Sequence, residues 1–167
     1  MVTINKIVIC ICFGFLFCSC QHLLYKDKLD QILGINQINI EATKQIDEIG
    51  GFGEGKTIEI YTLSEATINN FINQSDKILP NKNNWFKYDW TQGNINSFCK
   101  PIIDLSLNYK RETEIEDQLA EIKKSIPNAN MYISFYYNEK DIELSTQAQL
   151  MILDLETKNL YIIDTIM

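Results

Sequence analysis

The sequence predicts a single α+β domain that combines an antiparallel sheet with two main helices on one face of that sheet. Three strand-like segments fill the C-terminal third, and their short connections favour antiparallel pairing over parallel crossovers. Two segments further upstream repeat apolar residues at helical spacing. The chain has 167 residues and no internal repeat, so its length fits one domain once a leader is set aside.

The N-terminal segment has the layout of an export signal. Lys6 supplies a positive charge near the start, and an almost unbroken apolar run follows over residues 7–17. The run ends in Phe17-Cys18-Ser19-Cys20, in which a small residue directly precedes a cysteine. This segment resembles the lipobox of bacterial lipoproteins. The resemblance implies that residues 1–19 are removed and that Cys20 is acylated.

A lipoprotein signal predicts the location of the mature chain and its division into segments. Acyl chains such as palmitate on Cys20 would anchor it to a membrane at the extracytoplasmic face, either in the periplasm or at the cell surface. Three acyl chains suffice for stable anchoring, because a single chain binds only reversibly. We therefore expect a signal peptide over residues 1–19, a lipid-anchored tether or short helix over 20–36, and one α+β domain over 37–167.

Two alternatives to lipidation stay open. An uncleaved transmembrane helix needs about 20 apolar residues, whereas shorter apolar runs are typical of signal cores. Ser19, Gln21 and His22 interrupt an extension of the run toward Leu23. A soluble secreted form is the remaining alternative.

Charge and cysteine content exclude several classes of protein. The formal net charge is −7 and the chain has a single arginine, Arg111, which is unfavourable for binding nucleic acid. Cys99 is the one thiol left after removal of the signal and acylation of Cys20, so no intramolecular disulfide is expected. The lone histidine, His22, lies in the tether and cannot complete a zinc site. We expect no nucleic-acid partner, no metal, no cofactor and no catalytic residue.

The first half of the domain alternates between strand and helix patterns. Residues 23–33 have apolar side chains at helical spacing before a glycine, although a frayed tether fits equally well. Isoleucines between residues 38 and 49 predict one or two strands, and residues 57–63 alternate as a strand does. Ser64 has the chemistry of a helix N-cap. The apolar stripe Ile68, Phe71 and Ile72 follows it at helical spacing.

The second half contains the clearest helix and the C-terminal strands. Residues 112–125 carry acids early and lysines late, as the helix macrodipole prefers, and they end before Pro127. Strands are predicted over residues 131–137, 148–155 and 160–166, with a tight turn between the last two. Together these three segments predict an antiparallel meander.

The only glycine cluster of the chain matches a phosphate-binding loop letter for letter. The segment Gly50-Gly51-Phe52-Gly53-Glu54-Gly55-Lys56-Thr57 follows the pattern G-x-x-x-x-G-K-T. In a true phosphate loop the lysine and threonine open a helix whose N-terminus faces the anion. Here residues 58–61 predict a strand instead. We therefore interpret the cluster as a hairpin or bulge and expect Lys56 to bind no nucleotide.

Aromatic and acidic residues are candidates for a groove. Trp85, Phe86, Tyr88 and Trp90 follow one another closely and could line a carbohydrate or peptide site, but core packing is the interpretation we favour. Whether the two tryptophans are buried or exposed is left open by the sequence. The acids are scattered, and a solvated surface explains most of them: Glu54, Asp104, Glu112, Glu114, Glu116 and Glu143.

The glycine segment also carries a loose resemblance. This segment and several features after it resemble small uncharacterised bacterial membrane-associated proteins. The later features are the strand that follows the glycines, Trp85, the tyrosine-rich residues 133–137 and the final Asp-Thr of residues 164–165. Those proteins have a GGFHGDG-type segment. Gly53 stands where they have histidine and Glu54 where they have aspartate. The resemblance implies an α+β fold and transfers no activity.

Two functions are compatible with these patterns. The first is a lipid-anchored envelope protein that binds an unidentified partner, such as another protein, and has no catalytic role. The second is a hydrolase of the cell envelope that uses acids such as Asp104 or Glu54 in an aromatic-lined groove. A cleft with two facing carboxylates beside exposed Trp85 and Trp90 would favour the second.

Overall fold

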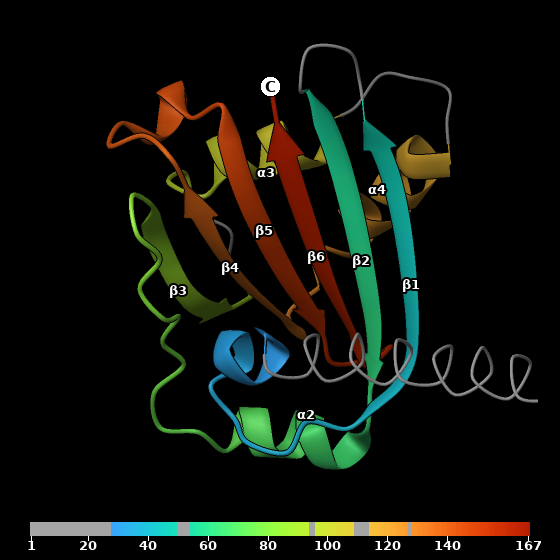
Figure 1. The fold of residues 1–167 in the computed structure, drawn as a ribbon. Coiled ribbons are helices and arrows are strands. Elements are labelled where there is room, and N and C mark those ends of the chain that lie inside the picture. The colour runs from blue at the N-terminus through green and yellow to red at the C-terminus, as the bar shows by residue number, and fades with distance from the viewer. Residues whose placement is uncertain (1–27, 50–53, 94–95, 109–113, 127) are drawn as a thin grey trace, which may run out of the picture.

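The computed structural model describes residues 28–49, 54–93, 96–108, 114–126 and 128–167 as one α+β domain. Its centre is a six-stranded sheet in the order β1-β2-β6-β5-β4-β3, in which all neighbouring strands are antiparallel (Figure 1). The predicted fold class is confirmed. The strands are β1 Ile40–Ile49, β2 Gly55–Leu63, β3 Phe86–Gln92, β4 Met131–Tyr137, β5 Gln147–Asp154 and β6 Asn159–Ile166.

The C-terminal meander is also confirmed, because β4, β5 and β6 follow one another in both sequence and space. Strands β4 and β5 are buried along nearly their whole length, since helices cover parts of both faces of the sheet. The turn between β5 and β6 contains Lys158 at a positive φ of 59°. Asp154 accepts hydrogen bonds from the backbone amides of Glu156 and Thr157 and from the Thr157 hydroxyl. Such local bonds are typical of an aspartate that opens a turn.

The helices are α2 Glu65–Ile72, α3 Lys100–Leu107, α4 Glu114–Ser125 and the short 3₁₀ helix η2 Ile142–Leu144. Ser64 is the predicted N-cap of α2, and its hydroxyl accepts a hydrogen bond from the Thr67 amide at 3.2 Å. Helix α4 has three acids in its first turn and two lysines in its last, as the macrodipole arrangement predicts.

The prediction that the two main helices share one face of the sheet is wrong. Helix α4 buries Ile115, Leu119 and Ile122 against the face that α3 also covers. Helix α2 instead buries Ile68 and Phe71 in the core on the opposite face. In Figure 1, α3 and α4 lie behind the sheet. Helix α2 and the short helix over residues 28–33, drawn in blue, lie toward the viewer and at the lower end of the sheet. Each helix has one apolar stripe, but a sheet with two apolar faces allows that stripe to pack on either side.

The helix over residues 28–33 packs on the domain, although it precedes residue 37, where the domain was predicted to begin. Residues 28–33 are helical, and their apolar side chains Leu29, Ile32 and Leu33 are at most 5 % exposed. Trp90 of β3 donates a hydrogen bond from Nε1 to the carbonyl oxygen of Ile32 at 2.9 Å. Of the two alternatives for this segment, the described residues therefore form a docked helix. Within the described ranges, no helix is long and apolar enough to cross a bilayer.

Candidate binding site

A row of polar side chains crosses the sheet on the face that α2 and the helix over residues 28–33 cover only in part. Direct cross-strand partners point to the same face, so the pairing register defines the row. Its members, one from each strand, are Asp47, Thr57, Asp164, Gln149, Tyr136 and Lys87. Among the described segments, the helices on this face lie toward the lower end of the sheet in Figure 1. The row therefore lies beyond the apolar core of this face.

A hollow of about 260 Å³ lies beside this row, and we call it the lysine pocket. The helix over residues 28–33, the loop before β3 and the strands β4 and β5 contribute its walls. Carboxamides, two lysines and a tyrosine provide polar contacts, and Ile32 and Pro80 provide apolar ones. The lining residues are Lys28, Gln31, Ile32, Pro80, Asn81, Lys82, Tyr136 and Gln149.

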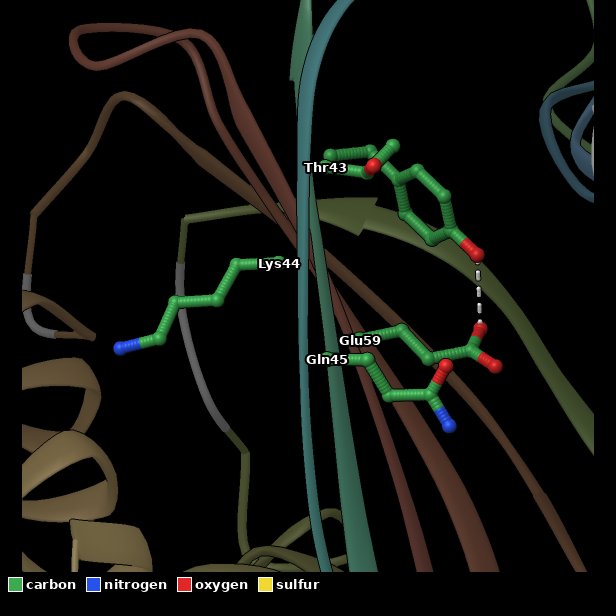
Figure 2. Close-up of a pocket in the computed structure, with 5 residues that line it drawn as sticks. Thr43, Lys44, Gln45 and Glu59 are labelled. Carbon is green, nitrogen blue, oxygen red and sulfur yellow. Dashed lines mark hydrogen bonds between the residues drawn. The ribbon is translucent and has the colours of Figure 1, made fainter.

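Glu59 connects the lysine pocket to a second, smaller hollow. Its Oε2 accepts hydrogen bonds from Lys28 Nζ at 3.1 Å and from the Tyr61 hydroxyl at 3.0 Å. The smaller hollow, of about 90 Å³, lies over β1 and β2 between Thr43, Gln45, Glu59 and Tyr61. Figure 2 shows Thr43, Gln45 and Glu59 on one side of the strands and Lys44 on the other. Glu59 is buried, with 9 % of the residue exposed, and its carboxylate is held from two sides.

Asp164 is the second carboxyl group of this region. It lies diagonally across the β2–β6 ladder from Glu59, whose direct partner is Ile162. Its Oδ1 accepts a hydrogen bond from Gln149 Nε2 at 2.7 Å. Burial raises the pKa of Asp164 above its ordinary value, and the charge of Glu59 acts in the same direction. The Gln149 hydrogen bond and the ammonium groups of Lys28 and Lys82 oppose that rise without cancelling it.

Lys82 sits on aromatic rings. Its Nζ lies 4.0 Å from the centroid of the Trp85 ring and 5.4 Å from that of Tyr136, within the range of cation–π attraction. The residue as a whole is exposed, but the rings displace part of the water around the ammonium. This desolvation lowers the pKa of Lys82; Asp164 raises it, and Lys28 lowers it further. Tyr136 itself donates its hydroxyl proton to the carbonyl oxygen of Pro80 at 2.7 Å, which fixes the ring.

The apparent phosphate-loop motif does not have the architecture of a phosphate loop. Thr57 lies in strand β2, as predicted, and the strand begins two residues earlier, so that it also includes Lys56. Strands β1 and β2 form an antiparallel pair in which Ile49 lies opposite Gly55. The chain therefore reverses direction between them, which confirms the hairpin interpretation. Residues 50–53 lie outside the described residues. Positive φ angles among the described glycines occur at Gly34 and Gly93, not at Gly55.

Lys56 has a structural environment that the sequence does not indicate. It is only 4 % exposed and donates hydrogen bonds to the carbonyl oxygens of Leu105 and Ser106 at the end of α3. Burial lowers its pKa to about 8. Lys56 therefore has a structural role, because it joins strand β2 to the end of helix α3.

The aromatic run divides between core and surface. Trp90 is 7 % exposed, and its ring packs edge-on against Phe71, so the favoured core interpretation is correct for this residue. Trp85 is half-buried under Lys82, while Phe86 is 41 % exposed at the edge strand β3. Tyr88 stacks on Phe135 with its ring centroid 4.9 Å away. The two tryptophans therefore do not form an exposed pair beside carboxylates.

The acids considered from the sequence lie elsewhere. Asp104 and Glu143 line a wide hollow of about 520 Å³ between α3 and η2. Glu54 is exposed, and Glu114 forms an exposed ion pair with Lys44 at 2.9 Å. Glu116 is half-buried in the first turn of α4, and Glu112 lies outside the described residues. Sequence reasoning did not single out the carboxyls of the polar face, Glu59 and Asp164.

Other predicted features can be placed only in part. The lipidation candidate Cys20 and the cleavage region lie outside the described residues. Cys99 is a buried free thiol, as a small apolar core residue would be. No group of three or more possible metal ligands occurs among the described residues.

One signal in the sequence could have indicated the polar face. Asp164 and Gln149 interrupt strands that are otherwise mainly apolar, and a polar residue at an inward position usually needs a partner. Lys28 and Lys82 carry no such signal, because each looks like an ordinary surface lysine.

Comparison with known proteins adds no assignment: no protein family, curated protein or solved structure matches this chain. The class of the molecule therefore follows from its own fold and site. It is an α+β domain with a partly covered sheet face, on which lysines and amides line a small pocket and two carboxyl groups lie beside it.

Proposed function

We propose that this chain is a lipid-anchored bacterial envelope protein that binds a ligand or partner and catalyses no reaction of its own. One observation supports the binding role above all others. Glu59 and Asp164 each accept a hydrogen bond from a neighbouring side chain, while their lysine and amide neighbours line a pocket. Polar groups held in place by one another are typical of a preorganised recognition site.

The proposed anchor would hold this face close to the membrane. Lys28 lies eight residues after Cys20 in the sequence, and a fully extended chain spans about 3.3–3.6 Å per residue. The pocket wall at Lys28 would therefore lie within about 30 Å of the lipid. A ligand for this site would be met at the membrane surface.

The anchor is tested by labelling cells that express the full chain with a clickable fatty acid. We expect the wild type to be labelled and Cys20→Ser to be unlabelled. Cys18→Ser is the matched control and should be labelled normally, because residue 18 belongs to the segment to be removed. Equal labelling of the wild type and Cys20→Ser would refute lipidation at this residue.

The binding role is tested with the small-molecule fraction of bacterial envelopes. We expect this fraction to raise the unfolding midpoint of the full chain and to raise that of Lys82→Gln less. A binding protein returns its ligand unchanged, so mass spectrometry should recover the same compounds before and after incubation. A fraction that shifts neither protein would count against the binding role.

A second candidate is a hydrolase of envelope material, and Asp164 is the observation that favours it. A carboxyl with a raised pKa beside a second carboxylate is an arrangement that acid–base hydrolases use. Soluble fragments released from isolated envelopes by the wild type, but not by Asp164→Asn or Glu59→Gln, would replace the binding role with this one.

A further inference from the structure

We propose that the lysine pocket binds a compact oxyanion, a carboxylate or a phosphate group, with Lys82 as its principal contact and Lys28 as its second. This inference rests on the proposed binding function and specifies the chemistry of its ligand.

The first argument is the state of Lys82. Among the described residues, no oxygen atom accepts a hydrogen bond from its Nζ, which contacts the rings of Trp85 and Tyr136 instead. An ammonium group has three donors and no acceptor capacity. The rings orient this group without using its donors, so they remain available to a ligand in the pocket.

The second argument is the placement of the carboxyl groups. Asp164 is the acid whose charge raises the pKa of Lys82, but its Oδ1 accepts a hydrogen bond from Gln149. Glu59 is bonded to Lys28 and Tyr61. Both carboxyls are therefore fixed on the sheet, while neither acid is part of the pocket lining. The lining itself carries two positive charges and no negative one.

The third argument is the mutual repulsion of the lysines. The charge of Lys28 lowers the pKa of Lys82, although by less than Asp164 raises it, so the ammonium groups of the two lysines that line the pocket repel each other. An anion between them relieves this repulsion and gains charge-assisted hydrogen bonds. The carboxamides of Gln31 and Asn81 line the same space and add neutral donors.

The size of the pocket limits the ligand. Its volume of about 260 Å³ lies below the roughly 300–1,000 Å³ that is usual for sites of drug-sized ligands. Ile32 and Pro80 provide a small apolar wall beside the charged groups. The site therefore suits one oxyanion on a small body, and not an extended chain.

The test is titration of the full chain, purified in a mild non-ionic detergent, with inorganic phosphate and with acetate. Ionic strength is held constant with sodium chloride, since screening alone weakens charge pairs. Acetamide is the matched uncharged probe for acetate. Binding is followed by calorimetry and by tryptophan fluorescence, because Trp85 lies directly beneath Lys82 and reports on its surroundings.

We expect saturable binding of at least one anion with a Kd on the order of 1 mM, as suits a ligand of about five heavy atoms. The anion that binds identifies the group as phosphate or carboxylate, and acetamide should give no signal. Lys82→Gln should weaken binding at least about tenfold. Lys82→Arg should retain it, and the exposed Lys140→Gln should leave it unchanged.

Two results would overturn the proposal. One is the absence of a saturable signal for both anions well above the expected Kd. The other is equal affinity of Lys82→Gln and Lys140→Gln for the anion. If Lys82→Gln does not fold, the affinities of Lys28→Gln and Lys82→Arg are compared with that of Lys140→Gln in its place. If neither anion binds but the envelope fraction still raises the unfolding midpoint, the oxyanion proposal is refuted and the proposed binding function is not. Failure of both would refute the function itself.

Discussion

The ammonium nitrogen of Lys56 lies 2.8 Å from the carbonyl oxygen of Leu105, which joins strand β2 to the last turn of helix α3. The last carbonyl groups of a helix have no partner within the helix, and a cation at this end also suits the macrodipole. Lys56 therefore links a strand to a helix that follows it by about fifty residues, through a buried contact.

Truncation of Lys56 should destabilise the domain. We expect Lys56→Ala to lower the free energy of unfolding by about 2–3 kcal/mol, because it leaves a cavity and removes donors from two buried carbonyls. Lys56→Met fills the space without the donors and should lose about 1 kcal/mol less. Urea unfolding measures both. A Lys56→Met variant less stable than Lys56→Ala would contradict this account.

The buried Lys56 should also make the free energy of unfolding depend on pH in the alkaline range. Its pKa is lowered to about 8 in the folded protein from an ordinary 10.5, so the folded state binds fewer protons between these values. The contribution of this group to stability should therefore rise from about pH 8 to 10.5, by at most about 3 kcal/mol. The difference in unfolding free energy between the wild type and Lys56→Met isolates it. A difference independent of pH would contradict the lowered pKa.

Asp164 should make the free energy of unfolding depend on pH in the acid range. Because its pKa is raised above 3.8, the folded state holds a proton that the unfolded state releases as the pH rises. The wild type should therefore lose stability relative to Asp164→Asn as the pH increases above about 4. Urea unfolding between acid and neutral pH tests this. The exposed Asp76→Asn is the control and should show no such trend.

The hydrogen bond from Trp90 to Ile32 should hold the helix over residues 28–33 on the sheet. Trp90→Phe keeps an aromatic ring but leaves the Ile32 carbonyl without its donor, at a cost of about 1–2 kcal/mol. Hydrogen exchange should accelerate in residues 28–33 more than in β5. Phe86→Leu at the exposed edge should change neither quantity. Uniform acceleration across the domain would indicate a general loss of packing instead.

Nucleotide should not stabilise the protein through the glycine cluster. Lys56 is committed to the end of α3, and the residues after it form a strand. We expect magnesium and ATP to leave the unfolding midpoint of the wild type unchanged. A rise in the midpoint that is lost in Lys56→Met would restore the phosphate-loop interpretation.

Part of the candidate site could be read from the sequence and part could not. Strand alternation places Asp164 and Gln149 at inward positions of C-terminal strands that were predicted nearly to their ends. Lys28 and Lys82 meet them only because the helix over residues 28–33 and the long loop before β3 pass over the same face. The sequence separation between these lysines leaves no periodic pattern to detect.

The sequence by itself determined the α+β class, the strands of the C-terminal meander and the helix that Ser64 begins. Period-two alternation, caps and turn residues act over a few neighbouring positions, so they can be read locally. Only the tertiary structure decided which face each helix covers, how Lys56 is buried and where the lysine pocket forms. The sheet order places β6 between β2 and β5, and this long-range pairing brings Glu59, Asp164 and Gln149 together. Such pairing depends on burying apolar faces of the whole sheet at once, and no short stretch of sequence records its outcome.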